Sequence, residues 1–287
     1  METLNIIIPE RMTGNRMDVA LSEMLPNYSR SKITAWIKSG DALIGEKTFK
    51  PKDKVNGPQL VRLSLNKKQN NDWSAENIPL NIVFEDEDII VINKACGLVT
   101  HPGAGNWSGT LANALLYYDP NLSTLDRAGI VHRLDKNTSG LMVIARNDKS
   151  QKLLVEQLQS HSVAREYSAI VYGHMIAGGM IDEPIGRDSR DRIKQAVSSS
   201  GKDAITHYRV IDRYKSHTHV KAILETGRTH QIRVHLSHIG YPLVGDLMYG
   251  GRVRFPKKAS ENLKEALLGF KRQALHSKKL TLNHPST

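Results

Sequence analysis

The apolar positions of the first 65 residues predict a small unit of strands and helices. A short apolar run at residues 4–8 predicts a strand, and apolar side chains then recur at helical spacing within residues 17–25 and 33–37. A turn between two short strands is predicted at residues 43–47, and a further strand at residues 61–65. Two short helices and a small hairpin are therefore expected at the N-terminal end of the chain.

A polar stretch without periodicity at residues 66–76 predicts a linker. It divides the chain into an N-terminal module with its linker, residues 1–72, and a larger domain, residues 73–287. Many strands, few helices and no regular alternation of the two predict an α+β fold, with a mixed, largely antiparallel sheet in the larger domain. The strands expected there are 82–85, 88–93, 165–172, 205–214 and 219–226, with one more near residue 280. The expected helices are 110–118, 149–159 and 229–238, with one more from residue 260. Residues 178–202 are expected to form a charged loop.

One dense polar turn lies between two apolar segments of the larger domain. Four ionisable side chains fall within five positions of it, His132, Arg133, Asp135 and Lys136, and small hydroxyl residues and a glycine follow. A turn held between buried segments can fix one carboxylate among cations, which keeps it ionised near neutral pH and lets it act as a nucleophile or base. The ordinary alternative for such a pattern is a solvated surface turn.

The formal net charge of +11 predicts a polyanionic partner, because a protein that neutralises phosphates gains affinity through counterion release. Binding to a membrane surface would require a basic amphipathic helix with large apolar residues opposite, and the sequence shows no convincing one. Nucleic acid is therefore favoured. Residues 1–72 contain twelve Lys and Arg against eight Asp and Glu, so the N-terminal module carries only part of the positive charge.

Length and composition indicate a soluble protein. The 287 residues give room for a small module and a second domain with its own core, and 39% of the residues are hydrophobic. No apolar run approaches the roughly 20 residues that span a bilayer. The first residues show no secretory signal, and the single cysteine, Cys96, excludes an internal disulfide. A cytoplasmic location is therefore expected.

The sequence from His132 to Leu141 resembles the catalytic-aspartate motif of the RluA-type pseudouridine synthases. Three further stretches are similar to motifs of that family and occur in its order: Asn93-Lys94 followed by Gly97 to Gly103, Arg165 to Ala169, and Gly227 to His235. The resemblance covers nearly the whole chain and is closest to the members that modify large-subunit (23S) ribosomal RNA. The N-terminal module resembles the S4-type RNA-binding module.

This resemblance implies that the protein converts uridine to pseudouridine in 23S ribosomal RNA or in the large-subunit particle, with the helix 69 hairpin as the expected target. The reaction breaks the N-glycosidic bond, turns the uracil and rejoins it through carbon. It consumes no hydride, phosphoryl group or water, so neither a metal nor a cofactor is required. It does require a uridine that has left its stack. The protein is expected to be a monomer without a membrane partner.

The resemblance also assigns roles to residues of the larger domain. Asp135 corresponds to the catalytic carboxylate, and Arg233 to the arginine that pairs with it, where a bidentate guanidinium would keep the carboxylate ionised. Tyr167 corresponds to the tyrosine beside the base and Ile232 to the neighbouring apolar position of the pocket. Arg133 corresponds to the residue that helps to extrude the uridine. The alternative for Arg133 is a structural salt bridge.

The N-terminal module contributes basic residues that are expected to contact RNA phosphates. Arg16, Arg30 and Lys32 lie on or beside its two predicted helices. Such contacts position the substrate and carry little sequence information themselves. A small basic domain with no particular partner is the alternative for this part of the chain.

Other functions remain open at this point. A related 23S enzyme type with different target uridines, or an inert RNA-binding protein, would share most of the motifs. A nuclease or glycosidase would want a second carboxylate or a metal near Asp135, where the motif shows only cations. His230, His235 and His238 could ligate a metal, but their spacing suits one helix face poorly. Cys96 is interpreted as a tolerated substitution rather than a nucleophile.

Overall fold

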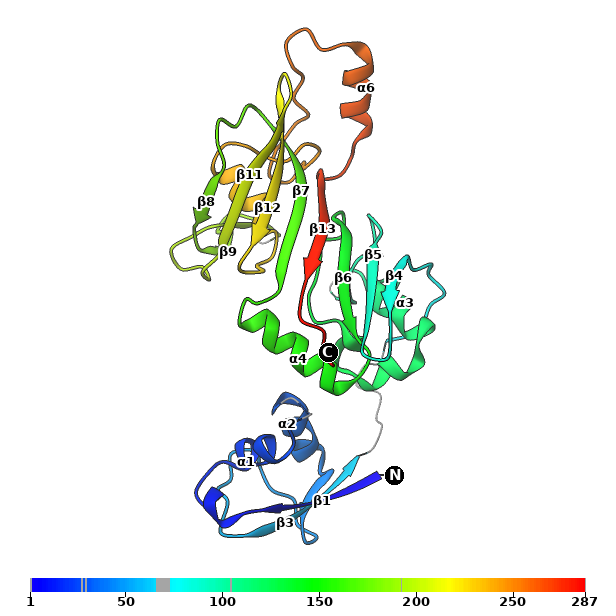
Figure 1. The fold of residues 1–287 in the computed structure, drawn as a ribbon, viewed down its shortest axis with the longest axis vertical. Coiled ribbons are helices and arrows are strands. Elements are labelled where there is room, and N and C mark those ends of the chain that lie inside the picture. Colours follow the sequence, from blue (N-terminus) through cyan, green and yellow to red (C-terminus); the bar gives the residue numbers. More distant parts are fainter. Residues whose placement is uncertain are drawn as a thin grey trace.

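The computed structural model describes residues 2–26, 28, 30–65, 73–103, 105–191 and 193–286. The N-terminal module, taken from here on as residues 2–65, consists of a three-stranded antiparallel sheet and two α-helices (Figure 1). Most of the predicted linker, 66–72, lies outside the described residues. The strands β1 (Glu2–Ile8), β3 (Gln59–Leu65) and β2 (Ala42–Ile44) lie in that order, with a 3₁₀ turn at Glu10–Met12 and the helices α1 (Met17–Met24) and α2 (Arg30–Ser39).

The N-terminal module has a hydrophobic cluster of its own. Leu21 of α1 and Ile33 and Ile37 of α2 are buried against Ile8 and Val61 of the sheet. The helices form because their apolar residues recur every three or four positions and so share one face. Helix α1 ends where Leu25 donates its backbone N–H to the carbonyl of Leu21, one residue before Pro26.

The larger domain is built on one eight-stranded sheet. Its strand order is β4-β5-β6-β13-β7-β12-β11-β8. Among the strands that the structure describes, β6 and β13 pair in parallel, and the other neighbours in this sheet are antiparallel. The predicted α+β fold with a mixed, largely antiparallel sheet is confirmed. The strands are β4 (Ile82–Glu85), β5 (Ile89–Lys94), β6 (Ser139–Ala145), β7 (Ala164–Tyr172), β8 (Gly179–Asp182), β11 (Ile205–Arg213), β12 (His217–Leu224) and β13 (Leu275–Thr281).

Four α-helices accompany this sheet, and side-chain caps fix the start of three of them. Thr110 caps α3 (Leu111–Tyr118) in a reciprocal capping box with Asn113. Asn147 caps α4 (Asp148–Gln159), and Ser260 caps α6 (Glu261–Gly269). Two 3₁₀ segments, Pro120–Thr124 and Asp126–Gly129, follow α3.

The fourth helix, α5 (Gln231–His238), begins two residues later than the expected helix 229–238. His230 is its N-cap residue, has a left-handed backbone with φ 59° and makes no capping hydrogen bond with its side chain. The side chain of Gln231 takes over the capping role, since its Oε1 accepts the backbone N–H of Arg228 (2.9 Å) and the hydroxyl of Thr226 (2.8 Å). The tight turn before α5 is therefore held from the helix side.

The prediction of a loop across residues 178–202 is wrong. This segment contains β8, which pairs with β11 at the edge of the large sheet, and the two-stranded hairpin β9 (Ile185–Arg187) and β10 (Gln195–Val197). These strands are three or four residues long, and β8 and β9 each contain a glycine and a charged residue, so propensity gives little sign of them. Burial of Ile181 and Ile185 is what places them.

The N-terminal module contacts the larger domain beside α4 (Figure 1). Lys32 of α2 donates to the carboxylate of Asp148, the first residue of α4, and its Nζ lies 3.4 Å from the carbonyl oxygen of Thr124. Lys152 of α4 donates to the carbonyl of Pro26. The contact is polar, and the side chain of Lys32 is only 17% exposed.

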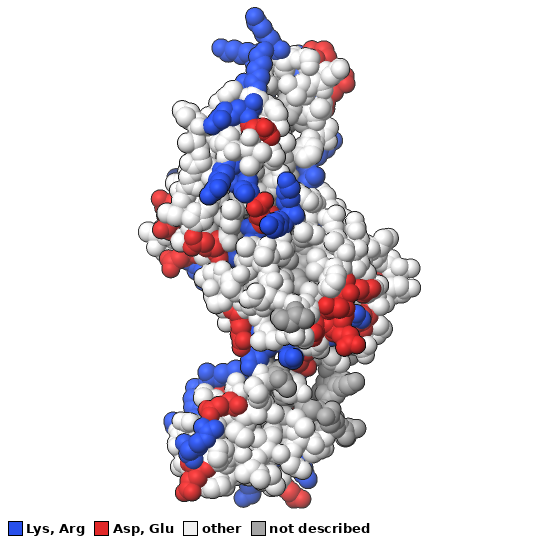
Figure 2. All heavy atoms as spheres, in the orientation of Figure 1, with Lys and Arg blue, Asp and Glu red and all other residues white. Residues whose placement is uncertain are grey.

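Lys and Arg side chains are unevenly distributed over the face shown in Figure 2. They gather over the N-terminal module and over the end of the larger domain that carries α6, while an acidic patch lies toward the end of β4 and β5. No helix among the described residues is long and apolar enough to cross a membrane.

Candidate active site

A pocket of about 570 Å³ opens beside the polar turn that follows Ile130. Three segments line most of it: the turn itself from 130 to 138, strand β7 through Arg165 and Tyr167, and residues 224–233, which join β12 to α5. The pocket thus brings together the family motifs that lie far apart in the sequence. Its volume is in the range of sites that hold a small organic ligand.

Buried hydrogen bonds hold the turn that carries Asp135. The carbonyl of Asp135 accepts the backbone N–H of Thr138 (3.0 Å), and the hydroxyl of Thr100 donates to the carbonyl of Leu134 (2.8 Å). The Lys94 ammonium, 2% exposed, donates to the carbonyl of Lys136 (3.2 Å) and to two carbonyls of its own loop. Burial lowers the pKa of Lys94 to about 8. The backbone on both sides of Asp135 is therefore fixed.

Gly140, the second residue of β6, allows the strand that follows this turn to lie directly against β13. A Cβ atom at this position would be 2.3 Å from the carbonyl oxygen of Ser277, and its φ of 118° is unfavourable for other residues. Ser277 belongs to β13 and pairs with Gly140 in the parallel register. The glycine in the motif is therefore a packing requirement of the turn.

Arg233 joins two carboxylates. Its Nη1 donates to Oδ2 of Asp135 (3.0 Å), while Nε and Nη2 donate to Oδ2 (2.7 Å) and Oδ1 (3.0 Å) of Asp246. The expected pair of Arg233 and Asp135 is present, but the bidentate fork faces Asp246, not Asp135. Burial alone would lower the pKa of Arg233. The two carboxylates outweigh this effect and raise the pKa above its ordinary value. The guanidinium stays charged and directs one oxygen of Asp135.

Asp246 is a second carboxylate near Asp135 that the sequence motif did not reveal. It is 4% exposed and also accepts the backbone N–H groups of Met248 (3.1 Å) and Tyr249 (3.3 Å). Because the guanidinium and these amides occupy both its oxygens, it is not free to act on a substrate. The arrangement therefore differs from the two working carboxylates of a glycosidase.

His230 faces the other oxygen of Asp135. Its Nε2 lies 4.0 Å from Oδ1 of Asp135, and its Nδ1 lies 2.7 Å from the hydroxyl of Tyr249. That hydroxyl accepts the backbone N–H of Gln195 (2.9 Å) and can donate its own proton to Nδ1. Burial lowers the pKa of His230, which favours the neutral ring. The tautomer in which Tyr249 donates to Nδ1 would place the ring proton on Nε2, toward Asp135.

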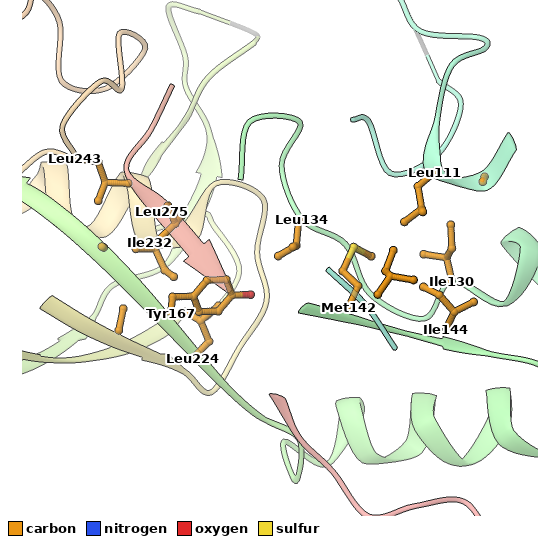
Figure 3. Close-up of a cluster of buried hydrophobic side chains, with 14 of the residues drawn as sticks. Leu111, Ile130, Leu134, Met142, Ile144, Tyr167, Leu224, Ile232, Leu243 and Leu275 are labelled. Atoms are coloured by element: carbon orange, nitrogen blue, oxygen red, sulfur yellow. The ribbon is translucent and has the colours of Figure 1, made fainter. Parts of the chain in front are cut away.

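Tyr167 and Ile232 form an apolar wall of the pocket with Leu224 and Leu275. All four are buried, and Figure 3 shows them together on one side of Leu134. Burial raises the pKa of Tyr167 to about 12, so its hydroxyl stays protonated at neutral pH. The wall offers a flat ring and aliphatic groups, which suit the face of a planar base.

Arg133 is exposed at the pocket and makes no ion pair among the described side chains. It lies two residues from Asp135 on the same turn. The structural salt bridge considered as an alternative for this arginine is not found in the described part of the chain. Its guanidinium is available to a phosphate or to the gap left by an extruded base.

The three basic residues of the N-terminal module have different surroundings. Arg16 and Arg30 both bind Asp18, at 3.0 Å and 2.8 Å, and remain 47% and 52% exposed. Burial would raise the pKa of Asp18, but the two guanidinium groups lower it below its ordinary value. Lys32 instead binds Asp148 of the larger domain. The structure does not bring these three residues to the pocket.

The alternative chemistries receive no support from the described geometry. Both ring nitrogens of His235 are engaged, with the hydroxyl of Thr206 and the carbonyl of Glu183, each at 2.9 Å. No group of three His, Cys, Asp or Glu side chains in the described ranges is arranged to hold a metal ion. Cys96 is exposed and its Sγ lies 3.6 Å from the carbonyl of Asn137, a loop contact.

His132 makes a testable contribution to acid sensitivity. Its Nε2 accepts the backbone N–H of Val143 (3.1 Å), which only the neutral ring can do, and burial lowers its pKa to about 4. The unfolded chain binds this proton near pH 6.5, so stability from His132 is present above that pH and is lost as pH falls from 6.5 through 4. We expect His132→Gln, which keeps an acceptor, to flatten the melting temperature against pH over that interval. An unchanged slope would contradict this assignment.

Asp246 and Tyr249 are the site residues that sequence reasoning missed, together with the role of Lys94. Asp246 and Tyr249 lie between Gly245 and Gly250 in a stretch with no other charge. A single carboxylate in an otherwise uncharged stretch indicates a buried ion pair, and this signal could have identified Asp246. Lys94 was visible only as part of a motif, because burial of a lysine at the end of a strand leaves no mark in the sequence.

Known proteins are similar in sequence to nearly the whole chain. Residues 88–238 match the family described as RNA pseudouridylate synthase. The ribosomal large subunit pseudouridine synthase D of Xanthomonas campestris pv. campestris is 50% identical over 97% of this chain and 84% of its own length. The protein of the same name from Escherichia coli K12 is 51% identical over 98% of this chain and 87% of its own length.

A solved structure supports the same relationship. Human RNA Pseudouridylate Synthase Domain Containing 1 is 26% identical, with a TM-score of 0.57 over 74% of this chain and 82% of its own. Together the matches extend from the N-terminal module to β13. The chain therefore belongs to the RNA pseudouridylate synthase family, as the resemblance of its motifs predicted, and it is an RNA pseudouridine synthase.

Proposed function

We propose that this protein isomerises uridine to pseudouridine in large-subunit ribosomal RNA, with Asp135 as the catalytic carboxylate. The observation that carries the proposal is the pocket in which Asp135, Arg233 and Tyr167 converge from three separate segments. The two relatives described above are named as large-subunit enzymes, and this chain matches 84% and 87% of their lengths. The helix 69 hairpin of 23S rRNA is the proposed target, with the related type that modifies other uridines as the alternative.

The geometry accounts for the demands of the reaction. Asp135 is 17% exposed and reaches into the pocket, so a ribose placed there would meet the carboxylate at C1′ or C2′. Arg233 holds one carboxylate oxygen and leaves the other toward the pocket and His230. Tyr167 and Ile232 offer a surface on which the detached uracil can turn without leaving.

The uridine must leave its stack to reach Asp135. Arg133 lies exposed on the same turn and is the residue that we propose takes the place of the base or holds its phosphate. Neither a metal nor a cofactor has a role in these steps. We further propose that the enzyme acts as a monomer in the cytoplasm.

The RNA is positioned by the N-terminal module in this proposal. Arg16 and Arg30 pair with Asp18 but keep about half of their side-chain surface exposed. This exposed surface can contact phosphates. Lys32 would have to exchange Asp148 for a phosphate, which would weaken the contact of the module with α4, where Lys152 also binds Pro26. Residues 1–72, including the linker, thus serve as an S4-like RNA-binding domain, and residues 73–287 as the catalytic domain.

The test of the proposed function uses large-subunit RNA that lacks pseudouridine. RNA from a deletion strain is incubated with the protein, treated with carbodiimide and mapped by primer extension for resistant adducts. New pseudouridines without strand cleavage are expected, within the helix 69 hairpin. Modification only elsewhere in 23S rRNA would favour the alternative type, and no pseudouridine in free RNA or in large-subunit particles would overturn the proposal.

Deletion of residues 1–72 should weaken RNA binding and flatten its dependence on salt. Each lost phosphate contact should lower the slope of log affinity against log salt by roughly 0.7 to 0.9. The catalytic residues all lie downstream, so the truncated enzyme should still isomerise at high concentration but choose among uridines less strictly. Binding at several salt concentrations and the map of modified sites measure both effects.

The double variant Arg16→Gln/Arg30→Gln is the matched control for this deletion, because it removes the two charges and keeps the chain of the module. Since the buried Asp18 loses both its partners, a melting curve must first show that the module still folds. If the double variant lowers the slope of log affinity against log salt nearly as much as the deletion does, these two residues make the phosphate contacts. Equal slopes and unchanged site choice for the deletion would show that the module does not handle RNA.

A further inference from the structure

Arg165 carries a buried positive charge without a carboxylate partner. Its side chain is on β7, and the residue is 7% exposed. One hydrogen bond is formed, from Nη2 to the carbonyl oxygen of Glu225 (2.9 Å), while Nε is buried with no acceptor in the described part of the chain. No described Asp or Glu lies within ion-pair distance of it. A buried charge is ordinarily paired, so this one requires an explanation.

The guanidinium lies at the wall of the active-site pocket. Arg165 and Tyr167 are two residues apart on one strand, so their side chains emerge on the same face, and both line the pocket. A Cβ atom on Gly227 would come within 2.6 Å of Nη1, which shows how closely the guanidinium lies against that exposed glycine. Asp135 in the same pocket is held by Arg233 and does not neutralise Arg165.

The proposed reaction produces an anion at this place. When the bond between N1 and C1′ breaks, its electron pair stays on N1, and the uracil becomes an anion whose charge spreads to O2 and O4. This holds whether Asp135 adds to C1′ or removes a proton from C2′. The uracil then turns, C5 bonds to C1′, the proton of C5 is released, N1 takes up a proton, and Asp135 is regenerated. The sum is an isomerisation.

We propose that Arg165 binds a carbonyl oxygen of the detached uracil and stabilises the anion, an inference that rests on the proposed function. The base would lie against Tyr167, with the unused N–H groups of Arg165 at its edge. The charge is therefore already in position when the anion forms, which is how an enzyme stabilises a transition state without reorganisation. A phosphate is the weaker candidate, because the neighbouring wall of Tyr167, Leu224 and Ile232 is apolar.

The test compares Arg165→Met with the unchanged enzyme on two RNAs, one with uridine and one with 5-fluorouridine at the target. Fluorine withdraws electrons from the ring and so stabilises the uracil anion, which then depends less on the charge of Arg165. We expect the single-turnover rate at saturating RNA to fall roughly 100-fold with uridine. The loss with 5-fluorouridine, measured as consumption of that nucleoside, should be at least about fivefold smaller, and the dissociation constant of the RNA should change by less than about twofold.

Gly227→Ala provides a second variant that keeps the arginine. The new methyl group would displace the guanidinium, a flexible chain end, so the same substrate-dependent loss is expected with an unchanged melting temperature. Arg146→Met is the control, because Arg146 is partly buried but pairs with Asp119 and Glu85 outside the pocket. It should lower the rates on both RNAs equally, if at all.

The outcomes separate this inference from the proposed function. Equal losses on both RNAs, or weaker RNA binding with an unchanged rate at saturation, would overturn the role of Arg165 while wild-type activity stands. A wild-type enzyme that forms no pseudouridine would instead overturn the proposed function.

Discussion

Asp135→Asn is expected to abolish isomerisation while leaving the fold and the RNA affinity nearly intact. The change keeps the size of the side chain and its contact with Arg233 but removes the reactive carboxylate. Loss of a nucleophile or essential base commonly costs several orders of magnitude in rate, so we expect less than about a hundredth of the wild-type single-turnover rate. Pseudouridine formation at saturating RNA and the dissociation constant of the RNA measure the two effects separately.

Asp212→Asn is the matched control, since Asp212 is 57% exposed on β11 and away from the pocket. It should behave as the wild type. Residual activity of Asp135→Asn above about a hundredth would exclude an obligatory carboxylate at this position. A parallel loss of RNA affinity would instead indicate that the substitution disturbs the turn.

The general architecture could be predicted because its determinants are local. Apolar spacing places α1, α3 and α4 within a residue or two of their bounds, and the long strands β7 and β12 are also predicted within two residues. The short strands β8, β9 and β10 could not be found in this way. Strand β8 depends on its pairing with β11 further along the chain, whereas β9 and β10 pair only with each other and depend on burial of single residues such as Ile185.

The candidate site shows the same division. The pairing of Asp135 with Arg233, 98 residues away, could be expected because the order of motifs resembles that of a known family. The fork from Arg233 to Asp246 and the unpaired charge of Arg165 could not, because a sequence does not state which buried charges meet. Likewise, nothing local distinguishes Lys32, which contacts the larger domain, from Arg16 and Arg30, which do not.

Asp246→Asn is expected to destabilise the protein more than any other conservative change at a carboxylate. Asp246 and Arg233 are 4% and 6% exposed, and the substitution would leave the guanidinium with Asp135 as its remaining carboxylate. Removing one partner of a buried pair costs up to about 3–5 kcal/mol, and Asp135, which is more exposed, would compensate the charge of Arg233 only in part. Urea denaturation should show a lower midpoint with an unchanged slope.

A matched control is available at Asp119, which pairs with Arg146 at 3.0 Å in a more open setting. Because those side chains are 11% and 29% exposed, Asp119→Asn should cost only about 1 kcal/mol or less. Asp246 touches no substrate in the proposed reaction, so its loss should also lower the single-turnover rate without weakening RNA binding, as Arg233 turns its free donors toward Asp135. Equal and small destabilisation by both variants would show that the buried fork is not what holds Arg233 in place.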